Sequence, residues 1–284
     1  MSLNEILSRQ GDILVMPGVY DALTAKIAEH VGFEAIFQTG YGTSASMLAL
    51  PDFGFLSISE TLETARRITR AVSIPLIVDV DTGYGNPLTV FKLVEDLQKI
   101  GVSGIFLEDQ VWPKRCGHMS GKDVISSDEY VQKLKSAIDA KGDNHEFKIV
   151  ARTDAAAPLG LDEAIRRGKL YREIGADIVF VEAPHSIEDM KKIANQIHAP
   201  LVANMIEEGV TPNLPAAELK ELGFRIALFP LSGLYSSTYG IYNTFKTLKQ
   251  SGTTKSVVNT MMQFKEFNEL VQLDKYMNME KKYA

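Results

Sequence analysis

Short apolar runs alternate with segments of helical periodicity along most of the chain. The runs are rich in β-branched and aliphatic residues, end in polar or small ones, and cover residues 14–18, 35–40, 76–81, 104–109, 148–154, 178–183, 201–205 and 226–231. Near-continuous apolar runs of this length are typical of parallel strands that are covered by helices on one face and by a barrel interior on the other. Eight such runs predict a (β/α)8 barrel of the TIM type.

The segments between the runs carry the signals of helices. Ser59 is a candidate cap for a helix that reaches residue 71, Asn86-Pro87 introduces a helix to residue 100, and residues 127–141 are amphipathic. No linker or low-complexity stretch interrupts the alternation. We therefore expect one α/β domain over residues 1–284.

Two segments exceed what a minimal barrel needs. Residues 111–124 form a long connection after the fourth run, and Gly117 and Gly121 could serve as its hinges, so we expect a mobile active-site lid there. From about residue 252 to 284, apolar residues recur at helical spacing, namely Phe264, Phe267, Leu270, Leu273, Tyr276 and Met279. We expect C-terminal helices that are swapped between subunits of a homotetramer, arranged as a dimer of dimers; packing on the chain's own barrel is the alternative.

Composition and charge exclude several classes of function. A hydrophobic content of 45% with 23% charged residues predicts a folded core rather than a disordered chain. The net charge of -6, without a concentrated basic stretch, disfavours a nucleic-acid partner. No apolar run has membrane-spanning length and the first residues lack the features of a signal peptide, so we expect a cytoplasmic protein without a membrane partner.

Carboxylates gather where three adjacent strands are expected to end. Asp79 and Asp81 are two positions apart, which places both on one side of a strand, Glu108 ends the next strand, and Asp52 lies in the connection after the second. Barrel enzymes carry their chemistry at this edge, and no dense basic cluster is expected to neutralise these charges. Carboxylate oxygens favour hard cations, so we predict a Mg²⁺ or Mn²⁺ site.

The other strand ends offer groups that suit a small dicarboxylate. Arg152 could clamp a substrate carboxylate in a bidentate manner, or form a salt bridge with Glu182, or both. Asn204 and Ser232 could donate to a second carboxylate. The segment Thr39-Gly40-Tyr41 offers backbone donors close to a ligand.

The single cysteine, Cys116, lies in the predicted lid within Lys114-Arg115-Cys116-Gly117-His118. A lone cysteine is most often a small buried apolar residue, and it cannot form an internal disulfide. Two cations and an imidazole beside it, together with its position next to the carboxylates, favour a role in proton transfer instead.

These motifs resemble the isocitrate lyase and phosphoenolpyruvate mutase superfamily over nearly the whole chain. The resemblance rests on Asp79-x-Asp81-x-Gly83, Glu108-Asp109-Gln110, Lys114-Arg115-Cys116-Gly117-His118 and Ala151-Arg152-Thr153-Asp154. The cysteine motif is that of the lyase branch, and longer strings around Trp112-Pro113 and residues 263–270 look most like the 2,3-dimethylmalate lyases and the plant petal death protein.

For a lyase, the resemblance implies a retro-aldol cleavage that gives a 2-keto acid such as pyruvate and a carboxylic acid. Mg²⁺ held by Asp52, Asp79, Asp81 and Glu108, directly or through water, would bind the substrate's 2-oxygen and adjacent carboxylate. Arg152, Glu182, Asn204 and the segment 39–41 would fix the departing enediolate. Cys116, with a pKa near its normal value, would protonate it, while His118 and Lys114 set the charge of the thiol; Tyr41 is one candidate base.

The chain departs from methylisocitrate lyases where two arginines bind the extra carboxylate of a tricarboxylate. Tyr235 and Phe264 align at those positions and cannot neutralise that charge, so we expect a 2-hydroxy dicarboxylate of the alkylmalate type. The alternatives are oxaloacetate hydrolysis, methylisocitrate cleavage, a phosphonomutase or carboxyphosphonoenolpyruvate mutase reaction, and a barrel without catalytic activity.

Overall fold

A barrel of parallel strands forms the centre of the molecule. The computed structural model describes residues 1–9, 11–118 and 121–284. Within them each predicted run contains a strand, as β1 Leu14–Val19, β2 Ile36–Gln38, β3 Leu76–Asp79, β4 Gly104–Glu108, β5 Lys148–Thr153, β6 Ile178–Val181, β7 Val202–Asn204 and β8 Ile226–Phe229. The strands pair in parallel in the order β6-β5-β4-β3-β2-β1-β8-β7, and a bridge between Val179 and Leu201 joins the two ends. The predicted (β/α)8 barrel is confirmed.

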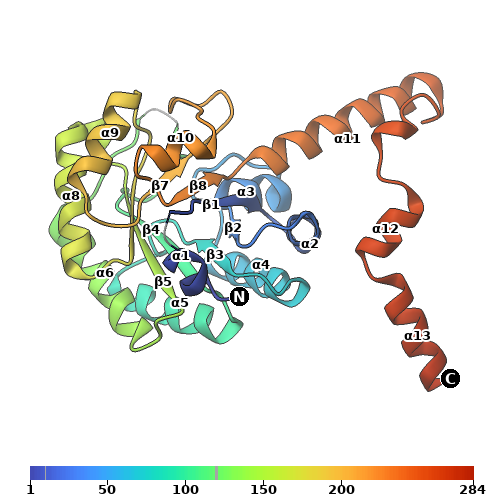
Figure 1. Ribbon diagram of the computed structural model, residues 1–284, viewed down its shortest axis with the longest axis horizontal. Coiled ribbons are helices and arrows are strands. Elements are labelled where there is room, and N and C mark those ends of the chain that lie inside the picture. Colours follow the sequence, from blue (N-terminus) through green and yellow to red (C-terminus); the bar gives the residue numbers. More distant parts are fainter. Residues whose placement is uncertain (10, 119–120) are drawn as a thin grey trace.

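Helices surround this barrel (Figure 1). They are α2 Ala22–Val31, α4 Ile58–Ala71, α5 Pro87–Ile100, α6 Ser127–Lys141, α8 Leu161–Ile174, α9 Ile187–Gln196 and α10 Ala216–Glu221, with the shorter α3 Gly40–Leu48 and α7 Ala156–Leu159 in the connections. The N-cap of α4 is Ser57, and not Ser59 as the sequence suggested. Ser57 Oγ accepts from the Glu60 N–H, and the Glu60 carboxylate accepts from the Ser57 N–H, so the two residues form a capping box.

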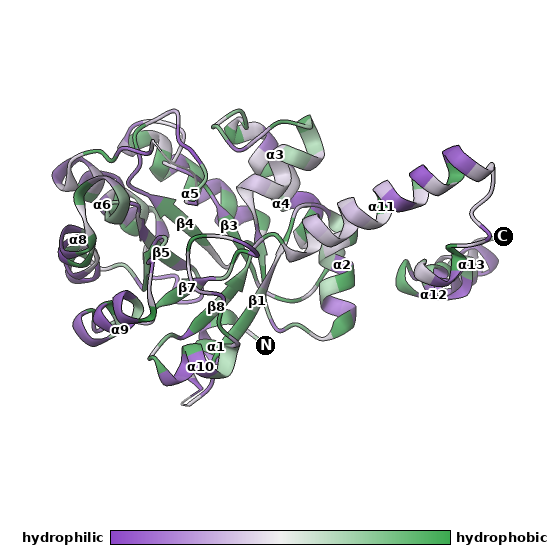
Figure 2. Ribbon diagram, turned by 90° about the horizontal axis from the view of Figure 1, so that it is seen from above, coloured by the Kyte–Doolittle hydropathy of each residue, from purple (hydrophilic) through white to green (hydrophobic). Residues whose placement is uncertain are grey.

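Two apolar layers hold the barrel and its helices together. One fills the interior with side chains from alternate strand positions, including Phe37, Phe106 and Phe180, whose neighbouring ring centroids lie 4.7 and 5.8 Å apart. The other lies between the strands and the helices, so that apolar strands are enclosed by more hydrophilic outer helices such as α8 (Figure 2). The short α1 Leu3–Ser8 closes the N-terminal end of the barrel with Leu3 and Ile6. The opposite end carries the polar residues.

The C-terminal segment forms an arm. Helix α11 Ser232–Ser251 leaves the barrel, the chain turns through η1 Val258–Thr260, and α12 Phe264–Leu270 and α13 Leu273–Tyr283 follow (Figure 1). Leu270 is buried where α12 contacts α2, yet Phe264 is 85% exposed. The predicted C-terminal helices are confirmed, and they cover little of their own barrel. Among the described residues, no helix is both long and apolar enough to cross a membrane.

Candidate active site

Side chains two positions apart in a strand point to the same face, so the residues that follow the inner apolar layer also point into the barrel. Phe37, Ile77, Phe106, Val150, Phe180 and Val202 point into the barrel. Two positions further along each strand direction lie, in the same order, Thr39, Asp79, Glu108, Arg152, Glu182 and Asn204. The barrel thus orients six polar side chains towards one another at the end where its phenyl rings stop.

A cavity with an empty volume of about 430 Å³ lies between these side chains and the lid. Its floor consists of Phe37, Phe106 and Phe180. Its polar lining consists of Thr39, Tyr41, Asp52, Asp79, Cys116, Arg152, Glu182 and Asn204, and Ile206, Leu228, Pro230 and Leu231 add an apolar wall. A few converging polar groups beside an apolar wall suit a small organic acid.

Lys114 reaches from the lid into the carboxylate group. Its ammonium is 3% exposed, forms a short contact with Asp52 and lies 2.7 Å from Asp81 Oδ1. No dense basic cluster was expected to neutralise these carboxylates, and a single buried lysine pairs with two of them. The contact between Asp52 and Lys114 spans 62 positions of sequence, which strand spacing does not reveal.

Asp79 and Asp81 also differ from the sequence interpretation. Strand β3 ends at Asp79, and Asp81 follows in a turn at a φ of +48°, so the turn and not the strand period brings the two together. The Asp81 backbone N–H donates to Asp79 Oδ1 at 3.1 Å. Burial raises the pKa of Asp81 to about 7, although Lys114 opposes this shift.

The residues fit a metal that keeps much of its water shell. Among the described residues Asp79 forms no ion pair, and burial raises its pKa although Lys114 and Arg152 nearby oppose the shift. Glu108 Oε1 is buried without a hydrogen-bond partner in the same part of the chain. No three His, Cys, Asp or Glu side chains among the described residues converge enough to hold a metal by themselves. Mg²⁺ commonly takes one or two carboxylates and completes its shell with water and substrate oxygens, which suits Asp79 with Glu108 and Asp81 nearby.

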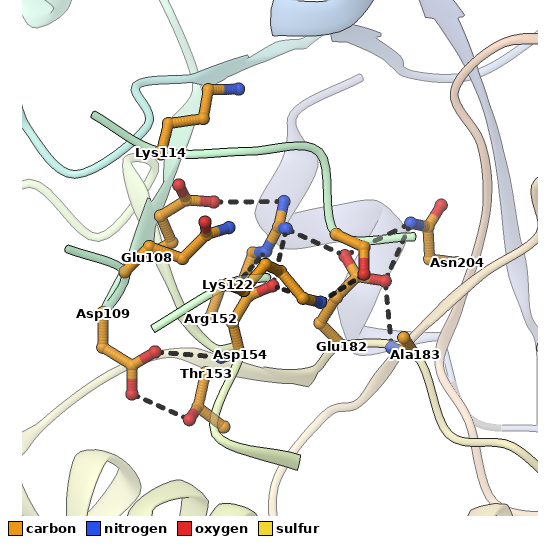
Figure 3. A network of polar contacts seen from close by, with 12 residues as sticks. Glu108, Asp109, Lys114, Lys122, Arg152, Thr153, Asp154, Glu182, Ala183 and Asn204 are labelled. Carbon is orange, nitrogen blue, oxygen red and sulfur yellow. Dashed lines mark hydrogen bonds and ion pairs between the residues drawn. The ribbon is translucent and has the colours of Figure 1, made fainter. Parts of the chain in front are cut away.

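Arg152 lies among three buried carboxylates. Its guanidinium contacts Glu108 at 3.3 Å, Asp154 at 2.8 Å and Glu182 at 3.2 Å (Figure 3), and it lies over the ring of Phe180. Burial favours the neutral form of Glu182, but Arg152 outweighs it and holds the pKa of Glu182 well below its usual range. The predicted Arg152–Glu182 salt bridge is confirmed, and Arg152 still lines the cavity.

Cys116 lines the same cavity. Burial raises the pKa of its thiol to about 11, and the nearby Asp52 and Glu182 carboxylates add to the effect. The expectation of a near-normal pKa is wrong, because the lid removes the thiol from water. Lys114 pairs with carboxylates and the His118 ring faces Glu182, so the charge state of the thiol is not set by either side chain. A hydrogen bond from the His118 backbone lowers the pKa of the thiol, and burial outweighs it.

The residues after Cys116 pack closely on β6 and the loop after β7. A methyl group on Gly117 would lie 2.5 Å from Glu182 Cγ and Oε2. His118 Nδ1 accepts from the Val210 N–H at 3.0 Å, which leaves Nε2 3.2 Å from Glu182 Oε1. Cys116 is held over the cavity by these neighbours.

The remaining predicted residues lie at the rim. The Gly40 N–H faces Asp79 Oδ2 at 3.4 Å, and Tyr41 hydrogen-bonds Tyr235. Ser232 donates to Glu207. Phe264 does not line the cavity of its own chain, because α12 belongs to the arm; its expected place against the substrate is not found within one chain.

Four further polar residues of this region received no role from the sequence. Asp109 accepts hydrogen bonds from Thr153 Oγ1 and the Asp154 N–H, Lys122 contacts Asp154, and Glu207 lies beside Ser232. Asp109 and Asp154 directly follow strands in the motifs quoted above, and this position could have indicated that they belong to the site. Lys122 and Glu207 carry no such signal.

Comparison with known proteins agrees with this geometry. The profile of the family described as phosphoenolpyruvate phosphomutase matches residues 3–241. The chain is 44% identical to 2,3-dimethylmalate lyase of Eubacterium barkeri over 99% of its length and 97% of the relative's. It is 45% identical to the petal death protein of Dianthus caryophyllus, covering 99% and 88%, and 47% identical to a chloroplastic carboxyvinyl-carboxyphosphonate phosphorylmutase of Arabidopsis thaliana, covering 99% and 84%.

A solved structure shares the whole fold. Oxaloacetate acetylhydrolase in complex with the inhibitor 3,3-difluorooxalacetate superposes with a TM-score of 0.93 at 35% identity, covering 99% of this chain and 96% of that one. The expected resemblance is confirmed, and the relatives include a lyase, a mutase and a hydrolase.

Proposed function

The chain belongs to the phosphoenolpyruvate mutase and isocitrate lyase superfamily, and from this membership we propose that it is a Mg²⁺-dependent lyase acting on a 2-hydroxy dicarboxylate of the alkylmalate type. The products would be a 2-keto acid such as pyruvate and a carboxylic acid. The observation that carries the proposal is the position of the half-buried Cys116, whose side chain lines one cavity with Arg152 and Asp79.

The side chains divide the reaction between them. Mg²⁺, when bound at Asp79 with Asp81, Glu108 and Asp52 nearby, supplies Lewis-acid stabilisation of the charge that develops on the substrate's 2-oxygen. Arg152, Asn204 and the backbone at Thr39 and Gly40 are placed to orient the substrate carboxylates. Asn204 donates to Glu182 and leaves its own Oδ1 without a hydrogen-bond partner among the described residues, so it retains capacity for a ligand.

Cys116 would deliver the proton that completes the cleavage. With a pKa raised to about 11 the group is a thiol at neutral pH and carries the proton that an enediolate fragment must receive. The closed packing of Gly117 and His118 on Glu182 excludes water from that fragment. Tyr41, in contact with Tyr235, is the proposed base for the 2-hydroxyl proton.

The apolar wall favours a substrate with alkyl groups. Ile206, Leu228 and Leu231 line the cavity. Tyr235, which hydrogen-bonds Tyr41 of the lining, stands at the sequence position where the resemblance implies an arginine in methylisocitrate lyases. A hydrocarbon substituent is therefore better matched than a third carboxylate.

Two other reactions have specific support. The oxaloacetate acetylhydrolase structure favours hydrolysis of oxaloacetate to oxalate and acetate, and the mutase relative favours phosphoryl migration. The cysteine motif argues against the mutase. A panel of 2,3-dimethylmalate, 2-alkylmalates, methylisocitrate, isocitrate, oxaloacetate and phosphonopyruvate, each with Mg²⁺, separates these reactions by the keto acid or oxalate released. Preference for a tricarboxylate would overturn the alkylmalate proposal.

We also propose that the arm completes a homotetramer, a dimer of dimers with α11 to α13 exchanged between subunits. The support is its row of exposed apolar residues, Tyr239, Ile241, Tyr242, Phe245, Phe264 and Tyr276. Light scattering of the full chain and of a Phe245→Glu variant tests this proposal: the wild type should be a tetramer and the variant smaller, and a monomeric wild type contradicts the proposal.

The mobility of the lid 111–124 and the cytoplasmic location likewise stay predictions, and one relative is named as chloroplastic.

A further inference from the structure

Lys122 is a buried cation that the proposed reaction does not use. Its side chain is 2% exposed, and its ammonium contacts the Gly117 carbonyl and lies 3.1 Å from Asp154 Oδ1 (Figure 3). A buried ammonium is costly unless its donors are paired, so these two acceptors fix where Lys122 lies.

The Gly117 carbonyl belongs to the residue that follows Cys116. Gly117 has no room to move towards the barrel, because Glu182 lies directly against it. Lys122 contacts the carbonyl of the same residue. The backbone that carries the thiol is thus fixed by both the Glu182 side chain and the Lys122 ammonium.

Asp154 connects this peptide with the substrate-binding side chain. Asp154 is fully buried, accepts from Arg152 Nε at 2.8 Å and from Arg152 Nη2 at 3.1 Å, and shares Oδ1 with Lys122. Its own backbone N–H donates to Asp109 Oδ1 at 2.9 Å, which anchors it to β4. One carboxylate therefore sets the positions of both Lys122 and Arg152.

We propose that Lys122 is a positioning residue, which docks the Cys116-Gly117 backbone on Asp154 and so places the thiol in register with Arg152. The effect on turnover rests on the proposed function, whereas the effect on the exposure of Cys116 does not. Loss of a hydrogen bond to a charged group shifts a local opening equilibrium by about tenfold or more.

The test compares Lys122→Met, Lys122→Arg and, as a matched control, Lys135→Met on the exposed face of α6. Alkylation of Cys116 by iodoacetamide, followed by intact mass, reports on the thiol alone because the chain has one cysteine. We expect Lys122→Met to react about tenfold faster than the wild type, Lys122→Arg to recover most of the protection, and Lys135→Met to be unchanged. The melting temperature of each variant is measured in parallel.

Turnover supplies the second readout. We expect kcat of Lys122→Met to fall about 100-fold, since a displacement near 1 Å has an effect of that order, with a smaller change in KM. Unchanged alkylation of Lys122→Met overturns the inference, whatever its kcat, and so does failure of Lys122→Arg to slow alkylation relative to Lys122→Met. If the wild type turns over none of the substrates, faster alkylation of Lys122→Met still supports the inference while the proposed function fails.

Discussion

Gly117→Ala should separate activity from stability. Gly117 does not have a left-handed φ, so alanine can adopt its backbone conformation, and Glu182 is the nearest obstacle among the described residues. The added methyl group would lie 2.5 Å from Glu182 Cγ and Oε2, where ordinary contact begins at 3.4 Å. Glu182 is fixed by Arg152, Asn204 and the Ala183 N–H, so the lid must move away by about 1 Å.

A shift of this size should reduce kcat about 100-fold, because Cys116 moves with Gly117 out of the position for proton transfer. The free energy of unfolding should fall by less than about 2 kcal/mol, since the lid can relieve the overlap towards solvent. Steady-state kinetics on the preferred substrate and urea denaturation measure the two effects. Lys135→Met, on the exposed face of α6, is the control. A kcat within threefold of wild type would refute the reasoning.

Three further predictions concern the buried charges and the thiol. Because burial raises the pKa of Cys116 to about 11, its alkylation rate should rise about tenfold per pH unit from pH 7 to 10; a plateau near pH 8.5 contradicts this, and Cys116→Ala should lose about 100-fold or more in turnover yet bind Mg²⁺ normally. Asp79→Asn should weaken Mn²⁺ binding, followed by electron paramagnetic resonance, beyond the roughly 10–100-fold typical of an outer-shell change, whereas Asp52→Asn should stay within that range because Lys114 already neutralises Asp52. Arg152→Met removes the cation shared by three buried carboxylates and leaves Glu108 without an ion-pair partner among the described residues, so it should cost about 3–5 kcal/mol in urea denaturation. The pKa of Glu182 lies below its unfolded value of about 4.3, so the stability it contributes is fully present above that pH and is lost as pH falls through the folded pKa. The deficit of Arg152→Met should therefore shrink on acidification, and a constant deficit argues against charge as its cause.

Local sequence determined the barrel and much of its polar rim. A short apolar run that is covered on both faces is best accommodated as a central parallel strand. Because side chains two positions apart point to the same face, Glu108 points the same way as Phe106, and Arg152 the same way as Val150. Asp79, Arg152, Glu182 and Asn204 could be assigned to one site for that reason. Helix boundaries were less certain, as the Ser57 cap shows, because Ser57 and Ser59 both have the chemistry of a cap.

Only the tertiary structure decided which charges meet. Lys114 lies between Asp52 and Asp81, and Lys122 lies between Gly117 and Asp154, through contacts that depend on how the lid folds over the barrel. The pKa of Cys116 depends on burial, and burial is a property of everything packed around the thiol rather than of its neighbours in sequence. Phe264 lies outside the cavity of its own chain, and an aligned position does not say where a projecting arm carries a residue. Sequence periodicity fixes directions within an element, whereas distances between lid, arm and barrel arise only when the elements pack together.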